Sequence, residues 1–126
     1  MKTRPLFIIQ GALSALFGVM FLAVPTLAMD TFVGTLGVTD SFYTMTRMIG
    51  GSSVVFAIIL FGALRFEDIR VKRLLALAMV VYKVVSVALH AYGVLIEAIL
   101  PAGWIMVGVD GVLALLFAST FLTKEP

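Results

Sequence analysis

The chain has 126 residues, of which 62% are hydrophobic and 13% are charged, with a formal net charge of +2 and a mean hydropathy of +1.16. A soluble domain carries about 45–50% apolar and about 25% charged residues, and a chain of this length could not hide so much apolar surface from water. The composition therefore predicts a protein embedded in lipid. The absence of cysteine excludes disulfides and thiolate sites, and no basic cluster interleaved with aromatics supports nucleic-acid binding.

Four apolar segments are long enough to cross the hydrocarbon of a bilayer, which takes about 17–25 helical residues. They are residues 6–24, 48–64, 74–100 and 102–122. Pro25 and Pro101 follow two of these segments, as expected for a residue that cannot continue a helix. The sequence has no alternating strands typical of a membrane β-barrel. We therefore expect an all-α polytopic membrane protein, with residues 1–126 forming a single domain built as an up-down four-transmembrane-helix bundle.

The first apolar segment resembles a signal peptide because it follows Lys2 and Arg4. Its 19 apolar residues exceed the core of a signal peptide, which has about 7–15, so we expect a retained membrane helix. Gly11 and Gly18 lie in this segment, and Gly50 lies at the start of the second. Small residues let helix backbones approach closely. The contact could form between helices of one bundle or between subunits of an oligomer.

The longest connection, residues 25–47, contains Phe32, Leu36 and Tyr43 among threonines, glycines and aspartates. Aromatic side chains favour the depth of the membrane–water interface. The composition predicts either a segment lying on the membrane interface after the first helix or an ordinary loop anchored by a few apolar side chains.

The positive charges predict the orientation of the four helices. One side of the up-down arrangement carries Lys2, Arg4, Arg65, Arg70, Lys72, Arg73 and Lys124. The opposite side carries only Arg47. Cytoplasmic loops are enriched in lysine and arginine. We therefore predict a multi-pass protein of the bacterial plasma (inner) membrane, with both termini and the loop 65–73 in the cytoplasm.

The third apolar segment carries ionisable side chains at helical spacing. Lys83, His90 and Glu97 are seven residues apart, which is close to two turns of an α-helix, about 7.2 residues. Ser86 falls on the same helical face. The pattern predicts one polar face of this helix, opposite a face of valines and leucines.

Counting the rise along each helix predicts which of these groups meet. Asp110 in the fourth segment falls near the level of His90, and Arg47 near that of Glu97. Charged groups at the bilayer centre cost about 2.5–3.5 kcal/mol each, so they face the bundle interior and pair. We predict the pairs His90–Asp110 and Arg47–Glu97. Lys83 could reach toward Asp110.

Gln10 and Ser14 on the first helix are the other predicted partners of Lys83. The resulting network could fix the register of the helices, at about 0.6–2 kcal/mol per contact. It could also line a polar cavity, an ion path or a proton relay. His90 could hold a cofactor, but nothing near it specifies one, so no cofactor is predicted. A single histidine cannot build a multi-histidine metal site, and no serine–histidine–acid set is visible, which disfavours an enzyme.

Three features carry a resemblance at the level of layout. Pro25 ends the first helix, RMIGG at 47–51 opens the second, and an acid, Asp110, lies in the fourth. In these features the chain resembles uncharacterised bacterial four-helix membrane proteins of the DoxX-like kind. The resemblance implies an accessory subunit of a membrane redox complex and assigns no site residue.

Two functions follow as predictions. The first is a non-catalytic accessory or scaffold component of a membrane assembly, bound to the lipid bilayer and to a larger membrane-protein partner. The second is a homo-oligomeric transporter or channel for a small solute, an ion or a proton. Transport would use the polar face of the third helix, Lys83, His90 and Glu97, together with Asp110.

Overall fold

The computed structural model of the chain describes residues 3–32 and 40–122, and all regular structure in these ranges is helical. The helices are α1 (Thr3–Ala23), α2 (Pro25–Phe32), α3 (Asp40–Ala63), α4 (Ile69–Leu95) and α5 (Gly103–Ser119). The predicted all-α class is confirmed for these residues. By length and composition, α1, α3 and α4 are long and apolar enough to cross a membrane, as expected of a membrane-embedded protein. α5 is apolar but has only 17 residues.

Two helices begin earlier than their apolar runs predict. α3 begins at Asp40 rather than at residue 48, and α4 begins at Ile69 rather than at residue 74. The start of α4 is explained by its N-cap, where the Asp68 carboxylate accepts a hydrogen bond of 2.7 Å from the backbone N–H of Arg70. A polar first turn of this kind is helical, but a prediction based on runs of apolar residues does not include it.

α4 also ends earlier than predicted, at Leu95 instead of residue 100. Glu97 has a φ of 60°, in the left-handed region. The N–H groups of Ala98 and Ile99 then donate to the carbonyl of Gly93 at 2.8 and 3.1 Å. This is a left-handed helix termination, which usually has glycine at the position of Glu97. Because glycine is absent there, the apolar run up to residue 100 conceals the end of the helix.

The predicted connection 25–47 contains a short helix and the start of a long one. α1 ends at Ala23, and Pro25 is the first residue of α2. A proline costs no hydrogen bond at this position, because the first backbone N–H groups of a helix have no partner within it. The last third of the connection belongs to α3. Leu36 of the predicted interfacial segment lies outside the described residues.

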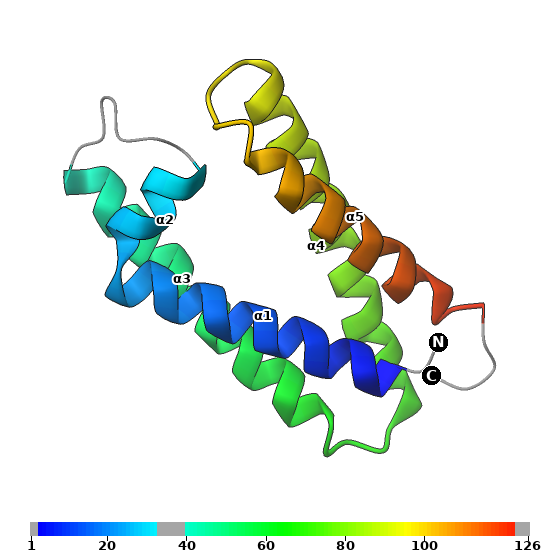
Figure 1. Ribbon diagram of the computed structural model, residues 1–126. Coiled ribbons are helices and arrows are strands. Elements are labelled where there is room, and N and C mark those ends of the chain that lie inside the picture. The colour runs from blue at the N-terminus through cyan, green and yellow to red at the C-terminus, as the bar shows by residue number, and fades with distance from the viewer. Residues whose placement is uncertain (1–2, 33–39, 123–126) are drawn as a thin grey trace.

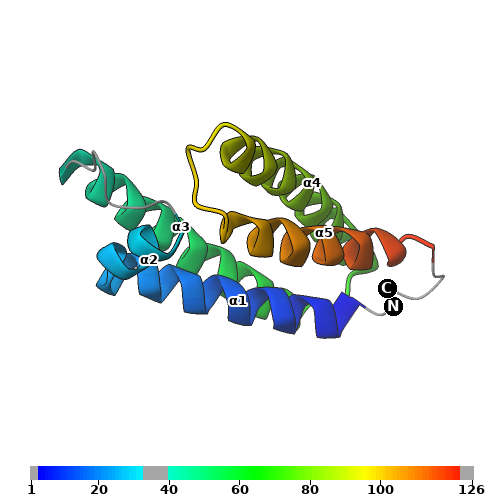
Figure 2. The ribbon, with the colours of Figure 1, turned by 45° about the horizontal axis from the view of Figure 1, so that its top comes forward.

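The long helices form two antiparallel hairpins. α1 packs along α3 and α4 packs along α5, whereas contacts between the two hairpins are few. Figure 1 shows the hairpins meeting near the start of α1 and the end of α5 and diverging toward α2 and the α4–α5 connection, and Figure 2 shows the same pairing from another side. The long helices all contribute to a buried apolar cluster, the apolar layer, formed by Leu6, Phe7, Leu60, Ala63, Ala76, Met79 and Phe117. It lies at the end where the two hairpins meet.

The first hairpin is held by a close approach of backbones. A Cβ atom added at Gly18 would lie 2.9 Å from the carbonyl oxygen of Gly50, and one added at Gly50 would lie 2.8 Å from the carbonyl oxygen of Gly18. Only glycine fits at either position. These two small residues therefore make a contact within one chain, one of the two alternatives that the sequence left open.

Candidate functional site

A layer of buried polar side chains lies directly next to the apolar layer. Lys83 follows Met79 by one turn of α4, and Gln10 follows Phe7 by one turn of α1. Asp110 comes from α5, so both hairpins contribute to this layer. The exposed fractions of Lys83, Gln10 and Asp110 are 5%, 4% and 2%. Burial of this degree requires partners for each polar group.

Lys83 and Asp110 form the one ion pair among the side chains that the structure describes. Lys83 Nζ lies 2.6 Å from Asp110 Oδ1, with both side chains almost completely buried. Each residue lies at the middle of its helix, where an unpaired charge in a bilayer is least favourable. The ammonium also lies 5.3 Å from the centre of the Tyr82 ring, which adds a cation–π contact.

Ser86 and His90 extend this pair along α4. Ser86 Oγ donates to Asp110 Oδ2 at 2.5 Å. His90 Nδ1 lies 2.8 Å from the carbonyl oxygen of Ser86 and 3.2 Å from its Oγ. A carbonyl oxygen only accepts, so Nδ1 carries the hydrogen in this arrangement. The result is a chain of contacts from His90 through Ser86 and Asp110 to Lys83.

The structure corrects the predicted pair His90–Asp110. The partner of Asp110 is Lys83, and His90 reaches the carboxylate only through Ser86. The prediction compared the depths of Cα atoms along ideal parallel helices. It gave too little weight to the long lysine side chain, which moves its charge about a turn away from its own Cα position.

The predicted pair Arg47–Glu97 is also corrected. Both residues are exposed, and neither takes part in an ion pair with another described residue. Glu97 lies beyond the end of α4, in the left-handed position, so it does not continue the helical face of Lys83 and His90. The seven-residue spacing predicted a shared face only on the assumption that the helix continued.

Gln10 and Ser14, predicted as partners of Lys83, bond to each other. Gln10 Nε2 donates to Ser14 Oγ at 3.1 Å. The other end of the amide, Gln10 Oε1, is buried and has no hydrogen-bond partner among the described residues. An unpaired buried acceptor of this kind is uncommon and unfavourable.

These polar groups lie at the bottom of a cavity of about 370 Å³ between the two hairpins. Its lining residues are Gln10, Leu13, Ser14, Phe17, Phe21, Phe42, Thr46, Ile49, Ser53, Tyr82, Lys83, Ser86, His90, Ile99, Met106, Val109 and Asp110. The polar groups of the network come from α1, α4 and α5, whereas most of the remaining wall is aromatic or aliphatic. We call this space the central cavity.

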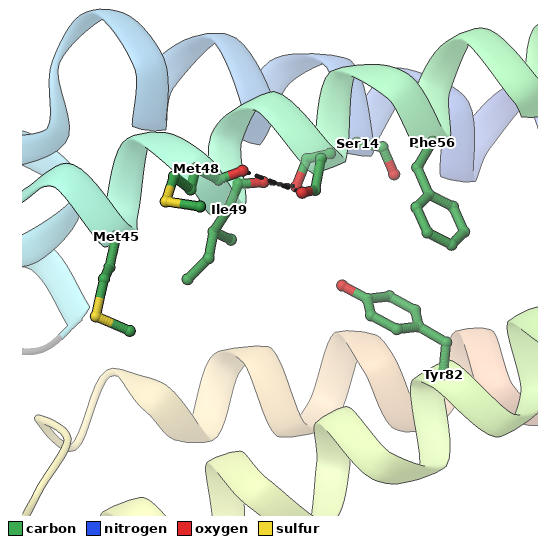
Figure 3. Close-up of a pocket in the computed structure, with 8 residues that line it drawn as sticks. Ser14, Met45, Met48, Ile49, Phe56 and Tyr82 are labelled. Carbon is green, nitrogen blue, oxygen red and sulfur yellow. Dashed lines mark hydrogen bonds between the residues drawn. The ribbon is translucent and has the colours of Figure 1, made fainter.

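A second cavity, of about 440 Å³, shares part of this lining and lies between α3 and α4. Figure 3 shows Tyr82 pointing from α4 toward α3, with Phe56 pointing back toward it. The two rings stack with centres 5.7 Å apart. Tyr82 was missed by the sequence reasoning. The signal that could have found it is a tyrosine in the middle of an apolar helix, far from the interface where tyrosine is enriched.

Comparison with known proteins finds no match. No protein-family model fits the chain, and neither a curated protein nor a solved structure is similar to it. The function of the polar network must therefore be inferred from its geometry. Among the described residues, no group of three or more histidine, aspartate or glutamate side chains is arranged to hold a metal ion. The polar network offers a charge-neutral ion pair, the hydroxyls of Ser14 and Ser86, an imidazole and an amide at one end of a largely apolar cavity.

Proposed function

We propose that the chain is a small transport protein of the bacterial plasma membrane, which holds a solute between its two hairpins. The observation that carries this proposal is the central cavity with the Lys83–Asp110 pair at its floor. Ligand sites are typically cavities of about 300–1,000 Å³ with a few polar groups among apolar walls. Ionisable residues in the middle of membrane helices usually mark solute or ion pathways.

The proposed topology has four spans, with α5 as the shortest. Its 17 residues reach the lower end of the about 17–25 that a span requires. The cations Arg65, Arg70, Lys72 and Arg73 favour a cytoplasmic position for the α3–α4 connection. An even number of spans then puts both termini on the same side. In this orientation the central cavity opens to the outside, and the apolar layer separates it from the cytoplasm.

The arrangement of the hairpins supports a mechanism of alternating access. Extensive contacts join the two long helices within each hairpin, whereas few contacts join one hairpin to the other. Transporters move a bound solute by rocking one rigid unit against another around a central site. Here Lys83 and Asp110 belong to the second hairpin and Gln10 to the first, so a solute contacting both would couple the two units.

Flux measurements in liposomes test this proposal. We expect solute or proton flux with the unmodified protein and its loss in Asp110→Asn, because Lys83 then loses the charge that balances it. Glu97→Gln is the matched control, since it removes an exposed carboxylate outside the central cavity. The comparison uses protein that circular dichroism shows to be folded. Flux of the unmodified protein no greater than that of empty liposomes, across ions and small neutral solutes, would reject the transport function, and equal flux in folded Asp110→Asn would reject the role of the ion pair.

A second candidate function is the accessory or scaffold component. The observation that favours it concerns Gly51, Gly62 and Gly108, where an added Cβ would meet no described atom within 4 Å. Outward-facing glycines allow a helix of another protein to approach closely. Native mass spectrometry of the protein, extracted gently from its host membrane, separates the two. A complex with a larger, different protein favours the accessory function, whereas a homo-oligomer favours transport.

A further inference from the structure

The floor of the central cavity is lined by Gln10 and Lys83 from opposite hairpins, and each side chain has unused hydrogen-bonding capacity. Gln10 Oε1 is buried without a partner. The ammonium of Lys83 can donate several hydrogen bonds, and Asp110 is its one oxygen acceptor among the described residues. Leaving a buried polar group unpaired is costly, so a bound molecule that pairs both groups would be favoured. Such a molecule needs a head group that donates to Gln10 and accepts from Lys83.

The charges of the site indicate that this molecule is uncharged. Lys83 and Asp110 neutralise each other at 2.6 Å, and Ser86 occupies the second oxygen of the carboxylate. Among the described residues of the floor, no charged side chain is left free to balance an ionic ligand. An uncompensated charge in a site of low dielectric is strongly unfavourable. A neutral head group avoids this penalty.

The walls of the cavity indicate an apolar body. Phe17, Phe21, Ile99 and Met106 line it beyond the polar floor. The second cavity continues this space between α3 and α4, where Met45, Met48 and Phe56 line it with exposed side chains on the face of α3. A molecule dissolved in the bilayer could therefore enter from the side of α3 and pass Tyr82 to reach the floor.

From these observations we infer that the central cavity binds an uncharged amphipathic molecule whose head group both donates and accepts a hydrogen bond. Primary amides and alcohols have such head groups. The head group lies between Gln10 and Lys83, and the apolar body lies among the aromatic walls. This inference rests on the proposed transport function, because it names the class of solute that the same cavity holds.

Three benzene derivatives of similar size test the inference. Benzamide donates and accepts, N,N-dimethylbenzamide only accepts, and benzoate is charged. Binding is measured by calorimetry with the full chain in lipid nanodiscs, and empty nanodiscs give the correction for partition into lipid. We expect benzamide to bind at least about tenfold more tightly than either analogue, since each lacks one feature that the floor selects. Equal affinity for N,N-dimethylbenzamide, or tighter binding of benzoate, would overturn the inference.

Two variants locate the binding. Gln10→Leu removes the unpaired acceptor at similar volume, and we expect it to reduce the affinity for benzamide by about tenfold. Ser53→Ala is the matched control, because this hydroxyl lines the same cavity but already donates to the carbonyl of Ile49 at 3.0 Å. An unchanged affinity in Gln10→Leu would overturn the inference. If this variant does not fold, the affinities of the three probes for the unmodified protein still test the inference.

The outcomes separate this inference from the proposed function. Preferential binding of benzoate would leave the cavity as a solute site while rejecting an uncharged solute. Failure of all three probes to bind to folded protein would overturn the inference and leave the flux comparison of Asp110→Asn as the test of transport. Loss of flux in that variant together with benzamide binding supports both.

Discussion

The two hairpins are held together by different means. Gly18 and Gly50 bring α1 and α3 into direct backbone contact, and no ion pair between described side chains joins these two helices. α4 and α5 are joined by the Lys83–Asp110 pair, with Ser86 as a third partner. In lipid, apolar side chains gain little from leaving the solvent, so helices associate through close packing and through polar contacts. The first hairpin uses close packing and the second uses polar contacts.

Breaking the ion pair should produce the largest effect on stability. We expect Asp110→Leu or Lys83→Met to reduce the free energy of unfolding by about 3–5 kcal/mol, because each leaves one buried charge without its partner. The double variant should cost much less than the sum of the two, since it leaves neither charge. Denaturant unfolding of all four proteins in one detergent gives the coupling energy of a double-mutant cycle. Additive single effects would show that the two charges do not depend on each other.

Crowding the first hairpin should have an intermediate effect. Gly18→Ala would bring a Cβ atom within 2.9 Å of the Gly50 carbonyl oxygen and of the Val54 nitrogen, so the helices must separate. We expect a loss of about 1–3 kcal/mol in the free energy of unfolding. Gly51→Ala is the control, because nothing lies within 4 Å of the new Cβ. It should stabilise α3 by up to about 1 kcal/mol through helix propensity. Destabilisation of similar size in both variants would contradict the close backbone contact.

A substitution just beyond the end of α4 should have the smallest effect on the free energy of unfolding, and it should raise this free energy instead of lowering it. Glu97 has a left-handed backbone, which costs a residue with a side chain about 1–2 kcal/mol relative to glycine. Glu97→Gly should therefore raise the unfolding free energy by about 1 kcal/mol. Glu97→Ala keeps the strain while removing the carboxylate. If both variants raise stability equally, the lost charge and not the backbone is responsible.

The sequence predicted which residues belong to the candidate site better than it predicted the contacts between them. Lys83, Ser86, His90 and Asp110 stand out in the sequence because polar residues are rare in such apolar segments, and the structure places all four around one cavity. Their pairing was not predictable, because a residue count along each helix gives the depth of Cα atoms and not the direction and reach of the side chains. Glu97 was assigned to the same face for a related reason. Helical spacing has meaning only up to the residue where the helix ends.

The sequence by itself determined the all-helical class of the described residues, the approximate position of the long helices and the apolar character expected of a membrane-embedded protein, because composition and apolar run length depend only on local residues. It also singled out the polar residues. Only the tertiary structure decided that the helices form two diverging hairpins, that Lys83 rather than His90 pairs with Asp110, and that Gln10 Oε1 is left unpaired at the cavity floor. The physical reason is that these features depend on how helices cross and which side chains meet, and those contacts join residues far apart in the chain.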